Sequence, residues 1–155
     1  MNSRACSNPR ETKKAGPFPA SDETVEFPLA GSQALLTHQS LNELLHGIRD
    51  VHFFSQVGVS KPALKEIFDP LNAWIRAQKT DASGLPIATF DHPFSVTQIR
   101  ALRNSVELVM LDLGQEEFST RTGFSLAEAA ELLDRFNTAV LYPLRIERQI
   151  QAVAH

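Results

Sequence analysis

His46, Asp50 and His52 are the residues whose types and spacing first suggest chemistry, because imidazole and carboxylate groups bind metals and transfer protons. His46 and Asp50 are four positions apart, which places them on one face of a helix. A protein metal site normally takes three or four ligands, and no fourth residue has ligand-like spacing here. The spacing therefore predicts a surface His–Asp pair, while His38 and His92 are isolated.

Glu116, Glu117 and Arg121 form a second group of ionisable residues. Two carboxylates near a guanidinium could act as an acid–base site if they lined a cleft. Such charges more often cap helix ends or form solvated ion pairs. No zinc-protease motif, phosphate-binding loop, dinucleotide-binding glycine pattern or nucleophile elbow accompanies them. The sequence therefore predicts a protein that is not an enzyme, with no catalytic residue, no metal and no cofactor.

Length and composition narrow the class of protein further. The chain has 155 residues, of which 43% are hydrophobic, and this suits one domain. No apolar run approaches the roughly 18 residues of a membrane span, and the N-terminus lacks the apolar core of a secretion signal. The single cysteine, Cys6, cannot form an intrachain disulfide, which suits a reducing compartment. We therefore expect a cytoplasmic protein without membrane association.

The elements that would position these residues occur twice in the chain. An offset of 65 positions gives eight identities over about forty positions, where about two or three would arise by chance. The identical pairs are Gln33 and Gln98, Ser40 and Ser105, Phe53 and Phe118, Gly58 and Gly123, Ser60 and Ser125, Glu66 and Glu131, Asp69 and Asp134, and Asn72 and Asn137. These residues are typical of helix caps, turns and core anchors. The repeat predicts two tandem helix-turn-helix-like units that pack on each other about a pseudo-twofold axis, or on another chain.

Apolar residues recur at helical spacing after four serines that are good N-caps, Ser32, Ser60, Ser95 and Ser125. No segment has the alternation of a convincing strand. The fold class predicted is therefore all-α, a small bundle of about six to seven helices. We expect a first repeat unit over residues 31–79, a linker over 80–94, a second unit over 95–143 and a C-terminal helix over 144–155, all within one domain.

Residues 1–30 are predicted to form a disordered N-terminal arm. They hold four prolines and no apolar periodicity, so they bury too little surface to offset the entropy of ordering. Phe18, Phe27 and Leu29 are the exceptions in this arm, and they could dock on the body of the protein.

A glycine turn between two short apolar patterns suggests a contact with nucleic acid. The pattern consists of Phe53, Val57, Gly58, Val59, Leu64 and Ile67. It resembles the core of a helix-turn-helix, and the resemblance implies that Lys61, Lys65 and Gln56 would contact DNA. Phe54 departs from the motif, which usually has a small residue there. The alternative interpretation is a helical corner with the same turn chemistry, and the net charge of −3 argues mildly against a dedicated nucleic-acid binder.

Phe54, Trp74 and Arg121 are the candidate interface residues, because aromatic and arginine side chains are enriched in binding hot spots. Trp74 would otherwise lie in the core. Residues 41–48 and 118–123 also resemble parts of short helical proteins from bacteria, and this likeness carries no function. The first hypothesis is a bacterial adaptor, inhibitor or regulatory subunit that binds a partner protein or a second copy of itself. A DNA-binding regulator that uses residues 53–68 is the alternative.

Overall fold

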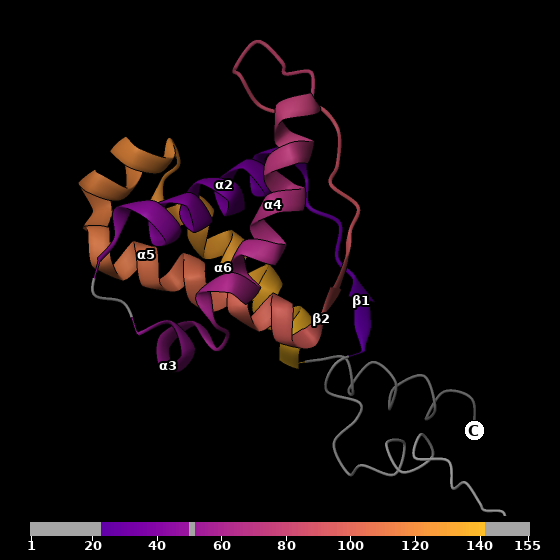
Figure 1. Ribbon diagram of the computed structural model, residues 1–155. Coiled ribbons are helices and arrows are strands. Elements are labelled where there is room, and N and C mark those ends of the chain that lie inside the picture. The colour runs from indigo at the N-terminus through magenta and orange to yellow at the C-terminus, as the bar shows by residue number, and fades with distance from the viewer. Residues whose placement is uncertain (1–22, 50–51, 142–155) are drawn as a thin grey trace, which may run out of the picture.

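Helices form most of the part of the chain that the computed structural model describes, which is residues 23–49 and 52–141 (Figure 1). The elements follow in the order β1 (Thr24–Glu26), α2 (Gly31–Asn42), the π-helical turn η2 (Glu43–Gly47), α3 (Phe53–Val57), α4 (Lys61–Ala77), β2 (Pro93–Ser95), α5 (Val96–Thr122) and α6 (Leu126–Leu141). The prediction of a mostly helical protein is confirmed.

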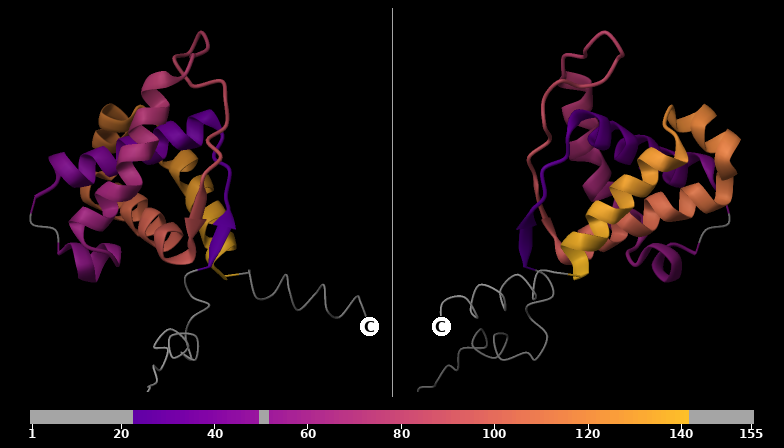
Figure 2. Two further views of the ribbon diagram at one scale, coloured as in Figure 1. Left: turned by 45° about the vertical axis from the view of Figure 1, so that its right-hand side comes forward. Right: turned by 180° about the vertical axis from the view of Figure 1, so that it is seen from behind.

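The long helix α5 holds the bundle together, because it contacts every other helix in the described part of the chain. In Figure 1 it crosses the middle of the molecule, with α2 above it and α3 below it, and Figure 2 shows α6 along its far side. Its apolar residues recur at helical spacing and are fully buried, as Ile99, Leu102, Val106 and Val109 show. The core therefore lies between α5 and the helices packed around it.

A small antiparallel sheet joins the segment before α2 to the segment before α5. β1 pairs with β2, and beyond it Leu29 and Phe90 exchange backbone hydrogen bonds of 3.0 and 2.8 Å. Phe27 and Leu29 are buried in the core. The prediction of a disordered arm over residues 1–30 is therefore wrong for residues 23–30, and the expectation of no strand is wrong at β1 and β2. Residues 1–22 lie outside the described part of the chain.

Three of the four predicted serine caps are confirmed. The hydroxyl oxygens of Ser60, Ser95 and Ser125 accept hydrogen bonds from backbone N–H groups three residues later, at 3.3, 3.0 and 3.1 Å. Ser32 is not a cap, because α2 begins at Gly31. A Cβ atom at Gly31 would lie 1.8 Å from the Pro86 carbonyl oxygen, so the close approach of the 78–92 loop sets this helix start.

The predicted helix count of six to seven is not reached within residues 23–49 and 52–141, which hold five α-helices and one π-helical turn. The sequence pattern also predicts that a helix ends at Gly114, before a short element at 118–122, and this break is confirmed. Gly114 has φ 75° and ψ 177°, which is not helical, so α5 consists of two helical segments that meet at a kink there. The predicted C-terminal helix, 144–155, lies outside the described residues.

Candidate functional site

A surface groove lies between α3 and α5. It has a volume of about 190 Å³ and is lined by Gln56, Asn104, Glu107, Leu108 and Leu111. Leu111 is 76% exposed and is one of four exposed large apolar side chains in the described part of the chain. We refer to this feature as the α3–α5 groove.

Short contacts fix the walls of the α3–α5 groove. The Asn104 side-chain amide donates a 3.1 Å hydrogen bond to the Val57 carbonyl oxygen, which ties the end of α3 to α5. Val57 is fully buried beneath it. Gly58 follows with φ 98°, a left-handed conformation that ends α3 and turns the chain into α4. The groove is therefore built on a well-anchored turn.

The predicted interface residue Phe54 lies on α3 and is 77% exposed. At about 100° per residue, Phe54 and Gln56 lie on opposite flanks of this short helix, whose buried face carries Val57. α3 therefore presents a polar flank to the groove and an aromatic flank to its other side. Trp74, also predicted as an interface residue, is half-buried and packs edge-to-face on Phe90, with ring centroids 5.2 Å apart.

Arg121, the third predicted interface residue, forms ion pairs with two glutamates. Its Nε lies 2.6 Å from Glu117 Oε1, and its Nη1 lies 3.0 Å from Glu43 Oε2. Hydrogen bonds to Glu43 and Glu117, the Glu43 bond first, raise the pKa of the exposed Arg121 guanidinium. Glu116 is exposed and makes none of these contacts. Arg121 thus forms a bridge between α5 and η2. The second carboxylate that it binds belongs to Glu43, 78 positions earlier in the chain, and not to Glu116.

The π-helical turn η2 brings Glu43 to this bridge. The Ile48 N–H group donates a 2.8 Å bond to the Glu43 carbonyl oxygen, the five-residue spacing that defines the turn. Gly47 leaves the room needed, because a Cβ atom there would lie 2.5 Å from Glu43 Oε2 and 3.6 Å from Arg121 Nη1. The sequence analysis did not predict Glu43 as a partner of Arg121. The one signal in the sequence was a difference between the repeats, because Glu43 is charged and its counterpart 65 positions later, Leu108, is apolar.

Lys61, Lys65 and Gln56, the predicted DNA contacts, are all exposed. The Lys61 ammonium lies 5.8 Å from the centre of the Phe53 ring, a cation–π contact. Acidic residues lie on the same helix, at positions 66 and 69. The described residues carry nine Lys and Arg against fourteen Asp and Glu, a formal net charge of −5. The two exposed lysines would attract the phosphates of DNA, but the net negative charge of the described residues would repel them.

The predicted surface pair of His46 and Asp50 stays a prediction, because Asp50 lies outside the described residues. His46 contacts the Phe68 ring edge-on, at 6.4 Å between ring centroids. His38 stacks on Phe68 at 5.0 Å, and its Nε2 lies 2.8 Å from Asn72 Oδ1. His38 therefore has a structural role in joining α2 to α4.

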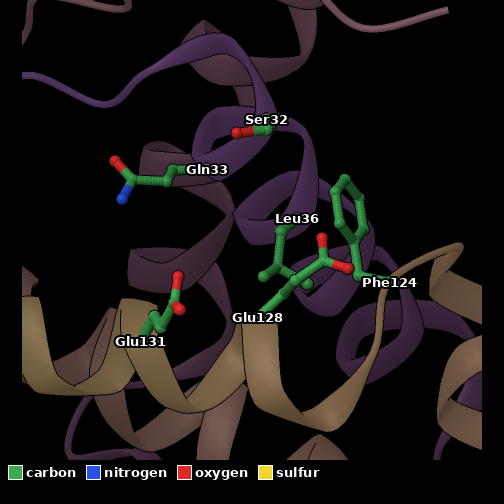
Figure 3. Close-up of a pocket in the computed structure, with 6 residues that line it drawn as sticks. All are labelled: Ser32, Gln33, Leu36, Phe124, Glu128 and Glu131. Carbon is green, nitrogen blue, oxygen red and sulfur yellow. The ribbon is translucent and has the colours of Figure 1, made fainter. Parts of the chain in front are cut away.

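A second groove lies between the start of α2 and the start of α6 (Figure 3). It has a volume of about 180 Å³. The Gln33 amide oxygen accepts a 2.9 Å bond from Arg135, and Glu128 accepts from the Ser125 hydroxyl at 3.2 Å. Figure 3 shows the Glu131 carboxylate pointing from α6 toward α2. Most of the polar lining is thus used by the protein itself, and one remaining carboxylate defines no ligand.

The space between β1 and α6 is the largest of these hollows, about 720 Å³. Arg135 lies at its wall, with the guanidinium carbon 4.3 Å from the centre of the Phe27 ring. Partial burial lowers the pKa of Arg135, but an arginine stays charged at neutral pH. β1 and the last turns of α6, which lie near the two ends of the described chain, line this region. It supports no assignment, because adjoining residues lie outside the described part of the chain.

Comparison of the chain with models of protein families, with curated proteins and with solved structures found no match. None of the described helices is long and apolar enough to cross a membrane. Within residues 23–49 and 52–141, no three His, Cys, Asp or Glu side chains gather as a metal ion would require. Function must therefore be inferred from the geometry of the chain itself.

Proposed function

We propose that the chain is a tandem duplication whose halves share one scaffold but differ around their glycine turns, and that one of these two surfaces binds a partner protein. The halves compared are residues 24–76 and 89–141, related by the offset of 65 positions. Gly58 and Gly123 support this proposal, because both have a left-handed backbone, with φ of 98° and 81°. Each is followed two residues later by a serine that caps the next helix.

Side-chain hydrogen bonds that recur at the same offset support the duplication further. His38 Nε2 lies 2.8 Å from Asn72 Oδ1 in the first half, and Arg103 Nε donates to Asn137 Oδ1 at 2.7 Å in the second. Each bond joins residues 34 positions apart, and each links the first long helix of its half to the last. The matched asparagines therefore have the same structural task.

The sheet fits a pseudo-twofold axis between the halves. Val25 pairs with Phe94, and Leu29 pairs with Phe90. A shift of 65 positions converts Val25 into Phe90 and Leu29 into Phe94, so it exchanges these two pairs. A twofold axis that passes between Phe27 and His92, which are also 65 positions apart, would relate the two pairs in the same way. The duplication thus extends to residues before the helices, where the sequence pattern indicates only an arm and a linker.

One observation carries the functional proposal: the α3–α5 groove is open beside the Gly58 turn, whereas the equivalent positions beside the Gly123 turn are bridged. Gln56 and Leu108 line the open groove. Their counterparts are Arg121 and Glu43, which form the 3.0 Å ion pair. The exposed Leu111 corresponds in the same way to His46. A bridged surface needs no partner, whereas an open groove with an exposed leucine suits a protein contact.

Phe54 supports the same conclusion from the other flank of α3. It is 77% exposed, and its counterpart is Ser119. We propose that the protein acts as an adaptor, inhibitor or regulatory subunit through α3 and the α3–α5 groove, and not as an enzyme. The DNA-binding alternative is favoured by the exposure of Gln56, Lys61 and Lys65, and it is disfavoured by the net charge of −5 on the described residues.

The test is capture of partners from native cell extract on the immobilised full chain, with and without nuclease. The double variant Phe54→Ser/Leu111→His gives the open side the residues found at the matching positions of the bridged side. Ile87→Ser is the matched control, because Ile87 is 70% exposed but lies on the loop after α4. We expect a protein that binds the wild type and the control, resists nuclease and is lost with the double variant.

Two results would contradict the protein-binding proposal. The first is the absence of any captured protein that distinguishes the double variant from the control. The second is capture that depends on nucleic acid, which would favour the DNA-binding alternative. A gel-shift titration at low salt with Lys61→Ala/Lys65→Ala then decides whether these lysines contribute, since each lost phosphate contact weakens binding and lowers its salt dependence.

A further inference from the structure

We infer that the segment docked in the α3–α5 groove is an amphipathic helix of another protein, with an apolar anchor side chain and basic residues beside it. This inference rests on the proposed function and names the chemistry of its partner. The groove volume of about 190 Å³ is below the roughly 300–1,000 Å³ of small-molecule sites. It therefore suits one large side chain presented by a macromolecule.

The spacing of the two leucines in the groove favours a helical partner. Leu108 and Leu111 are three positions apart on α5, so they form one ridge along its surface. A second helix lying along this ridge would place residues spaced by three and four against it, which is the usual mode of helix-in-groove recognition. The backbone of α3 and α5 is engaged in helical hydrogen bonds at this point, so no strand edge is offered for a β-strand to join.

Charge at the edge of the groove favours a basic partner. Glu107 lines the groove, but its carboxylate lies 2.7 Å from Arg103 Nη1, so Arg103 offsets its charge. Asp112 follows Leu111 on α5 and is exposed. The described residues as a whole carry a formal net charge of −5. Lysine or arginine on the partner would be attracted to this edge, and the attraction would speed association more than it would tighten binding.

The same charges disfavour a second copy of this chain in the groove. A symmetric dimer through this face would use the same patch on both copies and so bring their exposed Asp112 carboxylates onto one interface. Each described body has the same negative charge, so the two would repel each other. We therefore assign the groove to a different protein.

Display selection tests the inference directly. The full-length protein is immobilised, and the probe is a library of helix-forming peptides of about 14 residues, long enough for about 21 Å of helix. We expect enriched peptides to carry apolar residues three and four apart with Lys or Arg on the flank. Their binding should weaken at least about tenfold with Leu111→His, as for a hot-spot contact.

Charge reversal and a matched control sharpen the test. Asp112→Lys should weaken binding of the enriched peptides about two- to fivefold, as expected for an exposed charge pair, and added salt should reduce this difference. Ile87→Ser should bind like the wild type. Circular dichroism checks that each variant is folded, and the exposure of Leu111 and Ile87 makes a loss of fold unexpected.

Several results would overturn the inference. They are no enrichment, peptides that are acidic or lack helical spacing, and equal binding to Leu111→His. Sedimentation that shows a dimer of the wild type, converted to a monomer by Leu111→His, would assign the groove to a second copy. If extract capture still depends on Phe54 and Leu111 in any of these cases, the proposed function stands and only the partner chemistry fails. If capture is independent of both residues, the proposed function fails as well.

Discussion

Phe27 attaches the segment before α2 to the helical bundle, and its replacement by alanine should destabilise the whole protein. The side chain is 5% exposed. Its ring stacks on Phe136 with centroids 5.2 Å apart, and the Arg135 guanidinium lies 4.3 Å from its centre on the ring face. Substitution by alanine removes all three interactions at once: burial, stacking and the cation–π contact.

The magnitude follows from these contacts. Truncation of a buried Phe to Ala typically costs about 3–5 kcal/mol. Because β1 is a three-residue strand that can relax around the lost ring, we expect the lower end of this range, about 3 kcal/mol. Phe27→Leu keeps most of the apolar volume and loses mainly the stacking and cation–π terms, so it should cost about 1–3 kcal/mol.

Urea unfolding followed by tryptophan fluorescence measures this effect. Trp74 is the one tryptophan of the chain and packs on Phe90, whose backbone pairs with Leu29 two residues after the substituted Phe27. With a urea m-value of about 1.5 kcal/mol/M, a loss of about 3 kcal/mol lowers the midpoint by about 2 M. Phe54→Ala is the control, because a 77% exposed ring should change stability by no more than about 0.5 kcal/mol.

Equal stability of Phe27→Ala and Phe54→Ala would refute this reasoning. It would mean that residues 23–30 contribute nothing to the folded body, as the proline-rich composition of the N-terminal region suggests. A change in the m-value without a change in the urea midpoint would also contradict this prediction. The substitution would then have altered the compactness of the native or unfolded state and not removed the contacts of Phe27.

Two further substitutions test other contacts by the same urea titration. Gly31→Ala should destabilise by about 1–3 kcal/mol or more, because the new Cβ would lie 1.8 Å from the Pro86 carbonyl oxygen; a wild-type midpoint would show that the 78–92 loop does not pack there. Asn137→Ala removes the acceptor 2.7 Å from Arg103 Nε and should cost about 1.5 kcal/mol, the low end for a hydrogen bond to a charged group. Asn137→Asp, which keeps an acceptor, should recover most of this loss.

Features set by neighbouring residues could be predicted from the sequence. Ser60, Ser95 and Ser125 cap helices because a side-chain oxygen and an amide three residues later need only local geometry. Gly58 and Gly123 end helices for an equally local reason, their access to positive φ. The glycine turns and three of the helix starts therefore follow from short stretches of sequence alone.

Features set by distant residues could not be predicted in this way. β1 and β2 are three residues each, too short for a readable alternation, and they pair across about seventy positions. The start of α2 depends on the approach of Pro86 to Gly31 rather than on the nearby Ser32. The partner of Arg121 is Glu43, and no local pattern links two residues 78 positions apart.

The repeat nevertheless contains information about the site, because the two glycine turns differ as a linked set of residues. The bridge beside the Gly123 turn needs Arg121, Glu43 and the open space at Gly47, where a Cβ atom would lie 2.5 Å from the Glu43 carboxylate. The counterparts on the open side are Gln56, Leu108 and Asp112, so all three positions differ between the two sides.

Because both residues of the ion pair differ at the open side, the open groove does not differ from the bridged side by a single substitution. Building the same ion pair on the open side would take changes at both position 56 and position 108, whereas the loss of a contact needs only one change. The three positions differ together while the turn glycines and capping serines around them stay the same. The coordinated difference is what a surface kept for a partner would produce, and it favours the side with the Gly58 turn as the one that binds.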